Sequence, residues 1–296
     1  MAKKIKDLAR KNPFLWVAYN VTRLAKGYQA VFLDYPVEAE PRWGYGKPVH
    51  PELYEILNRH RAHYAAMLKS FLPLKGALLA IPLTSPSGSL KPCWRNRWLP
   101  GGLDTLALYG MLAINRPKQY LEIGSGYSTR LARRAIRDYN LATTVTSIDP
   151  KPRAEIDKLC DRVVRKSLQE VDLAVFDDLE PGDVVFFDGS HRASMNSDVT
   201  VFFLEVLPRL LPGVFVHLHD IALPADYPPE WRDWYYSEQY LLAVSLLDSH
   251  PNFEIELPNA FVAADAELAA MVDPIWADAK MKEVPKQGMS FWMRMK

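Results

Sequence analysis

Strand-like apolar runs alternate with helical patterns through the C-terminal two thirds of the chain. Five such runs are apolar over most of their length rather than at every second position, and each precedes a segment with apolar residues at helical spacing. The runs are QYLEIG, TVTSID, RVVRK, DVVFFD and GVFVHLHD, and the helices are expected at 128–139, 152–160, 168–176, 197–211 and 237–249. Strands of this kind, joined by helices, form a parallel sheet covered on both faces. The sequence therefore predicts an α/β fold for this part of the chain.

The first third of the chain has a different pattern. Residues 1–75 are predicted to be helical, with an amphipathic stretch at 51–72. Residues 82–102 are dense in Pro, Gly and Ser, which is typical of a linker or surface loop. We therefore expect a helical N-terminal extension and linker at residues 1–95, followed by the main domain at residues 96–296.

The net charge of +1 on 296 residues gives no sign of a nucleic-acid partner. The first thirty residues contain seven basic residues and one acidic residue, a local charge of +6, and they include the apolar residues 14–17. A basic N-terminal helix is therefore expected. It either binds an anionic membrane surface or docks on the main domain with its basic face in solvent. No apolar run has the length of a membrane span, and the two cysteines lack CxxC spacing. We therefore expect a cytoplasmic protein.

Two glycines follow the first apolar run, in the stretch YLEIGSGYSTRLARRA at residues 120–135. In doubly wound sheets, ligands bind beyond the carboxyl ends of the strands. A dinucleotide site needs a third glycine or an alanine where this chain has Thr129, and Glu122 would repel a pyrophosphate. The carboxylate of Glu122 suits a cationic ligand such as S-adenosylmethionine, whose own carboxylate can meet backbone N–H groups at the start of the next helix. The alternative is a plain glycine turn with Glu122 facing solvent.

Asp149 ends the second apolar run, 23 residues after Gly126. An acidic residue at this distance can hold two ribose hydroxyls with its two oxygens. The helix between them carries Arg130 and three further arginines opposite its apolar face. We expect these arginines to face solvent.

The pattern E-x-G-x-G-x-S-T, followed by an acidic second-strand end, resembles motif I of class I S-adenosylmethionine-dependent methyltransferases. The stretches FFDGSHRASMNSDV, LLPGVFVHLHDI and GMSFWMR resemble a subgroup with a D-G-x-H motif after the fourth strand and H-D after the fifth. This subgroup is similar to metal-dependent, macrocin-type sugar O-methyltransferases. The resemblance covers residues 100–296 and implies a Rossmann-like, seven-stranded methyltransferase sheet. Its last strand, expected at 290–294, would run antiparallel.

The resemblance also implies the residues of a cofactor site. Carried over to this chain, the residues that contact S-adenosylmethionine would be Glu122, Gly124, Ser125, Gly126 and Ser128 at its methionine part, Asp149 at the ribose and Ser167 near the adenine. Ser167 has an alternative interpretation as a helix cap or turn residue.

The catalytic residues are expected after the fourth and fifth strands. A hydroxyl acceptor needs a base such as histidine or a divalent ion that lowers its pKa. Asp188 and His191 match the family's D-x-x-H motif, which implies that they are the catalytic pair and that His191 is the base. Asp188, His219 and Asp220 are the implied ligands of a divalent ion, Mg²⁺, Mn²⁺ or Fe²⁺, although His219 stands where the family has a carboxylate. The alternatives are a loop histidine at 191 and a core histidine at 217.

A proline-rich loop at residues 224–240 carries six Tyr and Trp residues. It is expected either to cover the acceptor as a lid or to be fastened to the N-terminal helices. The leading function is O-methylation of a hydroxylated small molecule or glycan, with S-adenosylmethionine as cofactor. The alternatives are a metal-dependent hydroxylase or lyase on the same scaffold and a non-catalytic nucleotide-binding protein. The acceptor and the oligomeric state stay open.

Overall fold

The computed structural model describes residues 12–25, 35, 37–86, 88–152 and 155–296. The chain divides into two units, residues 1–39 and residues 40–296. The first unit holds helix α2 (Pro13–Leu24), in which Phe14, Val17 and Val21 are exposed. Six of the seven basic residues behind the predicted membrane contact lie outside the described residues, so that contact stays a prediction. In the described part of the chain, none of the helices is long and apolar enough to span a membrane.

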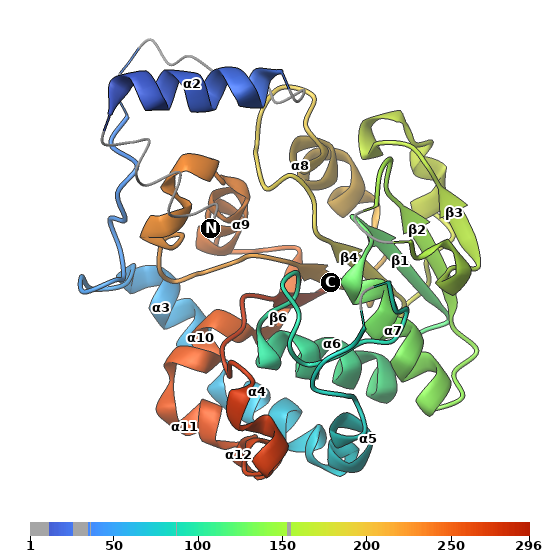
Figure 1. Ribbon diagram of the computed structural model, residues 1–296. Helices are drawn as coiled ribbons and strands as arrows, with labels where there is room; N and C mark the ends of the chain where they lie inside the picture. Colours follow the sequence, from blue (N-terminus) through green and yellow to red (C-terminus); the bar gives the residue numbers. More distant parts are fainter. Residues whose placement is uncertain (1–11, 26–34, 36, 87, 153–154) are drawn as a thin grey trace. The chain divides into compact units, whose positions relative to one another are not determined.

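A seven-stranded sheet forms the centre of the second unit, with the strand order β3-β2-β1-β4-β5-β7-β6 (Figure 1). The strands are β1 (Gln119–Ile123), β2 (Thr144–Ile148), β3 (Arg162–Val164), β4 (Val184–Phe187), β5 (Phe215–Leu218), β6 (Phe253–Pro258) and β7 (Phe291–Met295). Strands β1 to β5 are parallel, and β7 is antiparallel to both β5 and β6. The predicted fold class and the antiparallel last strand are confirmed. Strand β6 was not predicted.

The strand register brings the candidate site residues to one edge of the sheet. Ile123 of β1 is level with Ile148 of β2 and Phe187 of β4, and Phe187 is level with Leu218 of β5. These four strands therefore end level with one another, and the residues that follow them lie along the same edge of the sheet. The strand order reverses between β1 and β4, which is where ligands of such sheets bind.

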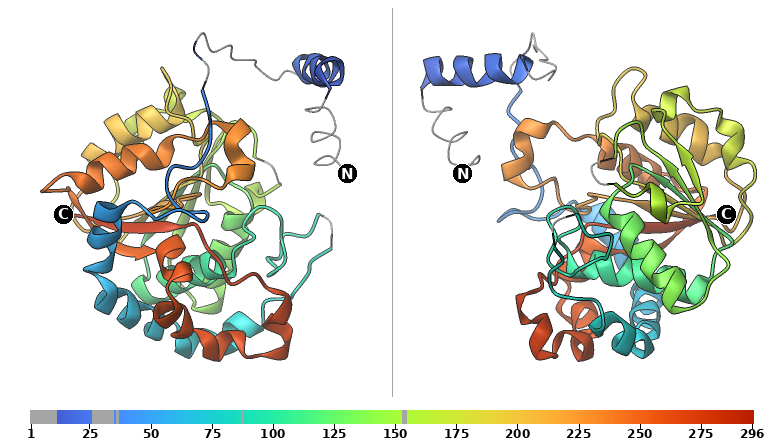
Figure 2. Two further views of the ribbon diagram at one scale, coloured as in Figure 1. Left: turned by 90° about the vertical axis from the view of Figure 1, so that its left-hand side faces the viewer. Right: turned by 45° about the vertical axis from the view of Figure 1, so that its right-hand side comes forward.

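Helices cover both faces of the sheet (Figure 2). Helices α6 (Gly102–Asn115) and α7 (Tyr127–Asp138) lie on one side, and α8 (Asp198–Val201) and α9 (Glu238–Leu247) lie on the other (Figure 1). The remaining α-helices are α3 (Pro51–Asn58), α4 (Arg61–Ser70), α5 (Lys75–Leu79), α10 (Asn259–Ala264), α11 (Ala266–Ala270) and α12 (Asp273–Trp276). Helix α6 is buried almost all round, as its apolar sequence requires.

The structure divides the chain after Ala39 rather than near residue 95. Helices α3 and α4 bury Leu53, Leu57, Tyr64 and Leu68 in the same hydrophobic core as the sheet. Because an apolar helix face needs a partner surface, these helices belong to the main unit instead of forming a separate extension.

Three of the expected helices are shorter or less regular than the pattern suggested. The described part of 152–160 contains a single 3-10 turn, and 168–176 contains two. The 197–211 helix is α-helical over Asp198–Val201, continues as a π turn over Phe202–Val206, and ends in a 3-10 turn over Leu207–Arg209. Pro208 lacks a backbone N–H, so the segment cannot continue as a regular α-helix through this position.

Candidate functional site

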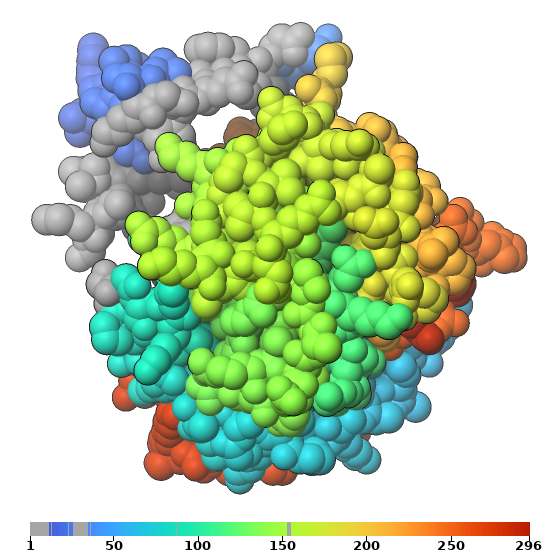
Figure 3. Space-filling view, turned by 90° about the vertical axis from the view of Figure 1, so that its right-hand side faces the viewer, coloured from blue at the N-terminus to red at the C-terminus, as the bar shows by residue number. Residues whose placement is uncertain are grey.

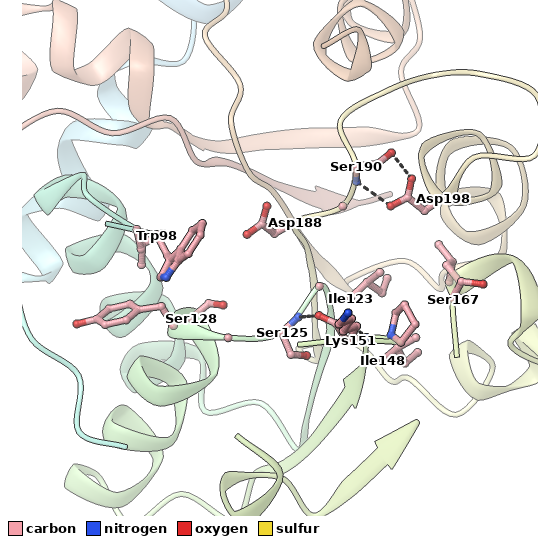
Figure 4. Close-up of a pocket in the computed structure, with 18 of the residues that line it drawn as sticks. Trp98, Ile123, Ser125, Ser128, Ile148, Lys151, Ser167, Asp188, Ser190 and Asp198 are labelled. Atoms are coloured by element: carbon pink, nitrogen blue, oxygen red, sulfur yellow. Dashed lines mark hydrogen bonds between the residues drawn. The ribbon is translucent and has the colours of Figure 1, made fainter. Parts of the chain in front are cut away.

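A cavity of about 630 Å³ opens at the carboxyl ends of β1, β2 and β4 (Figure 4). This volume lies within the range of small-molecule sites. Its wall includes Gly124, Ser125, Gly126 and Ser128 after β1, Asp149 after β2, Ser167 after β3 and Asp188 after β4. The structure therefore brings together all the predicted cofactor residues except Glu122. We call this space the β1 cavity.

The loop after β1 requires glycine at position 124. Gly124 has a φ of +80°, and a Cβ atom there would lie 1.9 Å from the backbone oxygen of Asp188. At Gly126, a Cβ atom would meet nothing within 4 Å. Gly124 thus lets β1 and β4 approach each other closely, whereas Gly126 leaves open space on the cavity side.

Three backbone N–H groups of this loop already have partners. The N–H of Gly124 donates to Ile148 O at 3.0 Å, and that of Ser125 donates to Asp149 Oδ2 at 2.9 Å. The N–H of Gly126 donates to Thr129 Oγ1 at 3.0 Å. The conformation of the loop is therefore fixed by the chain itself and does not depend on a ligand.

Glu122 lies beneath this loop instead of facing a ligand, which corrects the sequence-based interpretation. Its side chain is fully buried and is not part of the cavity wall. The hydroxyls of Thr129 and Tyr120 donate to its two oxygens, the latter at 3.2 Å. Burial raises the pKa of Glu122 to about 7, against the hydrogen bonds from Ser128 and Thr129. Thr129, the residue that breaks the dinucleotide pattern, thus supplies the hydroxyl that links Glu122 to the glycine loop.

The raised pKa of Glu122 predicts a pH-dependent stability. In the unfolded chain this carboxyl releases its proton at about pH 4.5, whereas the folded chain keeps it until about pH 7. The free energy of unfolding should therefore fall by about 3 kcal/mol as the pH rises between these values. Urea unfolding at pH 5 and pH 7.5 measures this difference. The free energy of unfolding of Glu122→Gln, whose side chain is neutral at both values, should fall less than that of wild type. The surface variant Glu254→Gln is the control, and an equal fall in wild type and Glu122→Gln would contradict the assignment.

Asp149 and Ser167 line the cavity and also make local bonds. Asp149 Oδ1 accepts from the N–H of Lys151 at 2.7 Å, in addition to the bond with the glycine loop. Ser167 donates its hydroxyl to Glu170 at 2.6 Å at the start of a 3-10 turn. Ser167 therefore fits both the cap and the cavity-wall interpretations.

Sequence analysis missed part of the cavity wall. Gly88, Trp98 and Leu99 belong to the 82–102 segment, which was expected to be a linker, and Arg130 was expected to face solvent. Tyr127 of α7 is hydrogen-bonded through its hydroxyl to the backbone of Cys93, which holds this segment against the helix. The teal atoms of the segment border the green atoms of the main domain in Figure 3. Two tryptophans in an irregular stretch were the available signal, because large aromatic side chains are seldom left without a packing surface.

Asp188, His191, His219, Asp220 and Glu238 form an acid–histidine cluster beside this cavity. His191 Nε2 lies 3.1 Å from Asp188 Oδ1 and 3.5 Å from Asp220 Oδ2, and His191 Nδ1 lies 2.9 Å from Glu238 Oε2. His219 Nε2 lies 3.7 Å from Asp220 Oδ1. His191 and Asp220 have φ values of +58° and +57°, a backbone conformation that non-glycine residues seldom adopt and that is concentrated at functional sites.

The surroundings of His191 favour its charged form. Burial lowers the pKa of His191, but hydrogen bonds to Asp188 and Glu238 and the charge of Asp220 outweigh it and raise this pKa well above its usual value. Both ring nitrogens then donate, Nδ1 to Glu238 and Nε2 to Asp188. His191 and Asp188 were predicted from the sequence, but the contact of His191 with Glu238 was not, because Glu238 is 47 residues away in the chain and reaches His191 from the first turn of α9.

Two neighbouring residues have structural roles. His217 is fully buried, stacks on Phe186 and bonds Ser290 Oγ at 2.8 Å, so it is a core histidine as predicted. Asp198 lies in the first turn of α8. It accepts from both the N–H and the hydroxyl of Ser190, at 2.7 and 2.5 Å, and so holds the loop that carries His191 (Figure 4).

Residues 121–221 match the family model described as a methyltransferase domain. This part of the chain is a methyltransferase domain. The match spans β1 to β5 and therefore includes the glycine loop, Asp149, Asp188 and Asp220.

The methyltransferase domain also resembles solved structures at low identity. An O-methyltransferase from Bacillus cereus in complex with SAH is 17% identical, with a TM-score of 0.35 over 78% of this chain and 91% of that chain. The O-methyltransferase TomG from Streptomyces achromogenes is 16% identical, with a TM-score of 0.33 over 66% and 80%. A putative O-methyltransferase from Klebsiella pneumoniae is 11% identical, with a TM-score of 0.41 over 77% and 89%. No curated protein matches the chain at a significant level.

The metal site predicted for the methyltransferase domain is not formed by the described residues, among which no group of three or more His, Cys, Asp or Glu side chains is placed to hold an ion. The ring of His191 lies between the carboxylates of Asp188 and Asp220. Two of the three implied ligands, Asp188 and Asp220, thus contact the imidazole of His191. Metal dependence stays a prediction.

The loop at residues 224–240, here called the aromatic loop, extends from the end of β5 to the acid–histidine cluster of the methyltransferase domain. The ring of Tyr236 lies 4.6 Å from that of His191, and Trp231 and Trp234 pack against Tyr236 at 5.7 and 5.3 Å. At the other end of the loop, Asp226 accepts from the N–H of Trp43 at 3.0 Å. The start of the loop is thus hydrogen-bonded to the segment that precedes α3, and Tyr236 near its end packs against the ring of His191.

Proposed function

We propose that this chain transfers a methyl group from S-adenosylmethionine to a hydroxyl of a small molecule or glycan. The observation that carries the proposal is that Asp188 belongs to both the β1 cavity and the acid–histidine cluster. Its side chain lines the β1 cavity and also contacts His191 Nε2 at 3.1 Å. A cavity suited to the methyl donor therefore adjoins a titratable group that can handle the acceptor's proton.

The residues of the cavity fit this cofactor. Asp149 has oxygens available to two ribose hydroxyls in addition to the two N–H groups that it already accepts. The open side of Gly126 leaves room for the donor next to the glycine loop. When bound, the cofactor supplies an electrophilic methyl group, which the acceptor oxygen attacks in line.

His191 is the group proposed to take the acceptor's proton. Its neutral form accepts at Nε2, while Glu238 holds Nδ1 at 2.9 Å and so fixes the orientation of the ring. Glu238 is fully buried, and burial raises its own pKa. We therefore assign Glu238 as a positioning residue and His191 as the catalytic residue.

The aromatic loop is proposed as the acceptor surface. Tyr236, Trp231 and Trp234 offer ring faces beside His191, and such faces pack on the apolar side of sugars or on planar rings. No nucleic-acid partner is proposed, because the net charge is +1. The two cysteines are free, which supports a cytoplasmic location.

S-adenosylhomocysteine should bind the protein and NAD should not. Thr129 in place of a small third residue, and the carboxylates of Asp149, Asp188 and Asp198 in the cavity wall, disfavour a pyrophosphate. At one hundred times its dissociation constant, S-adenosylhomocysteine should stabilise the fold by about 2.7 kcal/mol, measured as a thermal shift and confirmed by calorimetry. Stabilisation by NAD alone would refute the proposal.

A divalent ion held by Asp188, His219 and Asp220 is the second candidate for acceptor activation. Its support is that the carboxylates of Asp188 and Asp220 both approach one point, which the His191 ring now occupies, so an ion bound there would have to displace that ring. Loss of turnover in chelator, restored by Mg²⁺ or Mn²⁺, would favour this candidate over a metal-free histidine base.

A further inference from the structure

Arg130 lies in the wall of the β1 cavity and has no carboxylate partner among the described residues. It lies in the first turn of α7, and its Nε atom is buried with no hydrogen-bond partner among the described residues. The other three arginines of α7 all have an aspartate close by: Arg133 pairs with Asp161, and Arg134 and Arg137 approach Asp138. A buried guanidinium nitrogen without a partner costs free energy unless a ligand supplies one.

The glycine loop does not offer its own N–H groups to an anion. Those of Gly124, Ser125 and Gly126 donate to Ile148, Asp149 and Thr129, respectively. A carboxylate that enters the cavity on this side therefore finds its donors beyond these three residues, in the first turn of α7, which carries Arg130.

Charge divides the cavity wall into distinct regions. Its basic side chains are Arg130, which follows the glycine loop, and Lys151, which follows the proposed ribose residue Asp149 by two positions. Asp188, which follows β4, and Asp198, in the first turn of α8, also line the cavity and would repel an anion. With the ribose at Asp149, the methionine end of the cofactor lies toward the glycine loop, and the cation on that side is Arg130.

We propose that Arg130 binds the α-carboxylate of the cofactor's methionine moiety. The inference rests on the proposed function and deepens it, because it names the residue that distinguishes the complete cofactor from a bare nucleoside. A guanidinium presents two parallel N–H donors that match the two oxygens of a carboxylate. The ligand that Arg130 recognises is thus an amino-acid carboxylate attached to an adenosine.

The test uses two ligands that differ in this group. S-adenosylhomocysteine carries the α-carboxylate, and 5′-methylthioadenosine lacks the whole amino-acid part. Calorimetry should show that Arg130→Met binds S-adenosylhomocysteine about 10–100-fold more weakly than wild type, the range for a hydrogen bond to a charged group. Binding of 5′-methylthioadenosine should change by less than about threefold. Arg130→Lys, which keeps the charge but lacks the planar donor pair, should lie between Arg130→Met and wild type.

Arg137→Met is the matched control, because it removes an arginine from the same helix whose side chain is 67% exposed. It should bind both ligands as wild type does. Equal affinity of wild type and Arg130→Met for S-adenosylhomocysteine would overturn this inference alone. An equal loss for both ligands would also overturn it, since the effect would then not depend on the carboxylate. Failure of the wild type to bind S-adenosylhomocysteine would instead refute the proposed function, and this inference with it.

Discussion

Replacing His191 with asparagine is expected to lower turnover by about 10²–10⁴-fold, the usual contribution of a positioned general base. Asparagine is the appropriate substitution because it tolerates the left-handed conformation found at this position, φ +58°, but cannot accept the proton at neutral pH. The affinity for S-adenosylhomocysteine should stay within about threefold of wild type, because His191 is not part of the cavity wall. The measurements are steady-state kinetics on an acceptor found by screening sugars and phenols with a labelled methyl donor, and calorimetry.

The pH profile distinguishes a base from a structural residue. Only neutral His191 can accept a proton, and its pKa is raised, so the rate should increase with pH through a value above 6.5. This increase of the rate with pH should be absent in His191→Asn. In Glu238→Gln one of the carboxylates that favour the imidazolium is neutral, so the increase should move to lower pH. If His191→Asn keeps full turnover and the same increase, the base is another group.

Gly124→Ala is expected to destabilise the domain and abolish binding of S-adenosylhomocysteine. The left-handed backbone costs about 1–2 kcal/mol for a residue with a Cβ atom, and that atom would overlap the backbone oxygen of Asp188 at 1.9 Å. A total of at least about 2 kcal/mol corresponds to a fall in Tm of roughly 4–8 °C for a domain of this size.

Gly126→Ala is the matched control for Gly124→Ala. Its Cβ atom meets nothing within 4 Å, so its Tm should fall less than that of Gly124→Ala. Calorimetric scans of both variants without ligand decide the matter. Equal Tm values for the two variants would show that the close approach of β1 and β4 at Gly124 is not required.

The sequence predicted the sheet and the residues at the strand ends because both are encoded by nearby residues. A buried strand followed by a turn places the next side chain at the sheet edge, which was sufficient for Asp149, Asp188 and Asp220. Glu122 was misassigned because spacing along a strand does not reveal what covers each face. Here the covering group is the hydroxyl of Thr129, one turn into the next helix.

Long-range packing accounts for the remaining differences. Arg130 lies opposite the apolar face of its helix, and only the 82–102 segment, folded back over α7, makes that position part of a cavity. Glu238 meets His191 because α9 begins beside the loop after β4, a contact across 47 residues that no local pattern encodes. Strand β6 was missed because its sequence, FEIELP, is short and includes two glutamates and a proline.

Asp188 belongs to both halves of the site, since its backbone oxygen limits Gly124 and its carboxylate contacts His191. The spacing between methyl donor and proton acceptor is therefore built into one strand end of the central sheet. The proposed acceptor surface lies on a separate part of the chain, at residues 224–240, which is anchored through Asp226 to the segment before α3. Evolution of new acceptor preferences can thus proceed in the aromatic loop while the reacting groups keep their distance, an arrangement that favours divergence of substrate within a conserved chemistry.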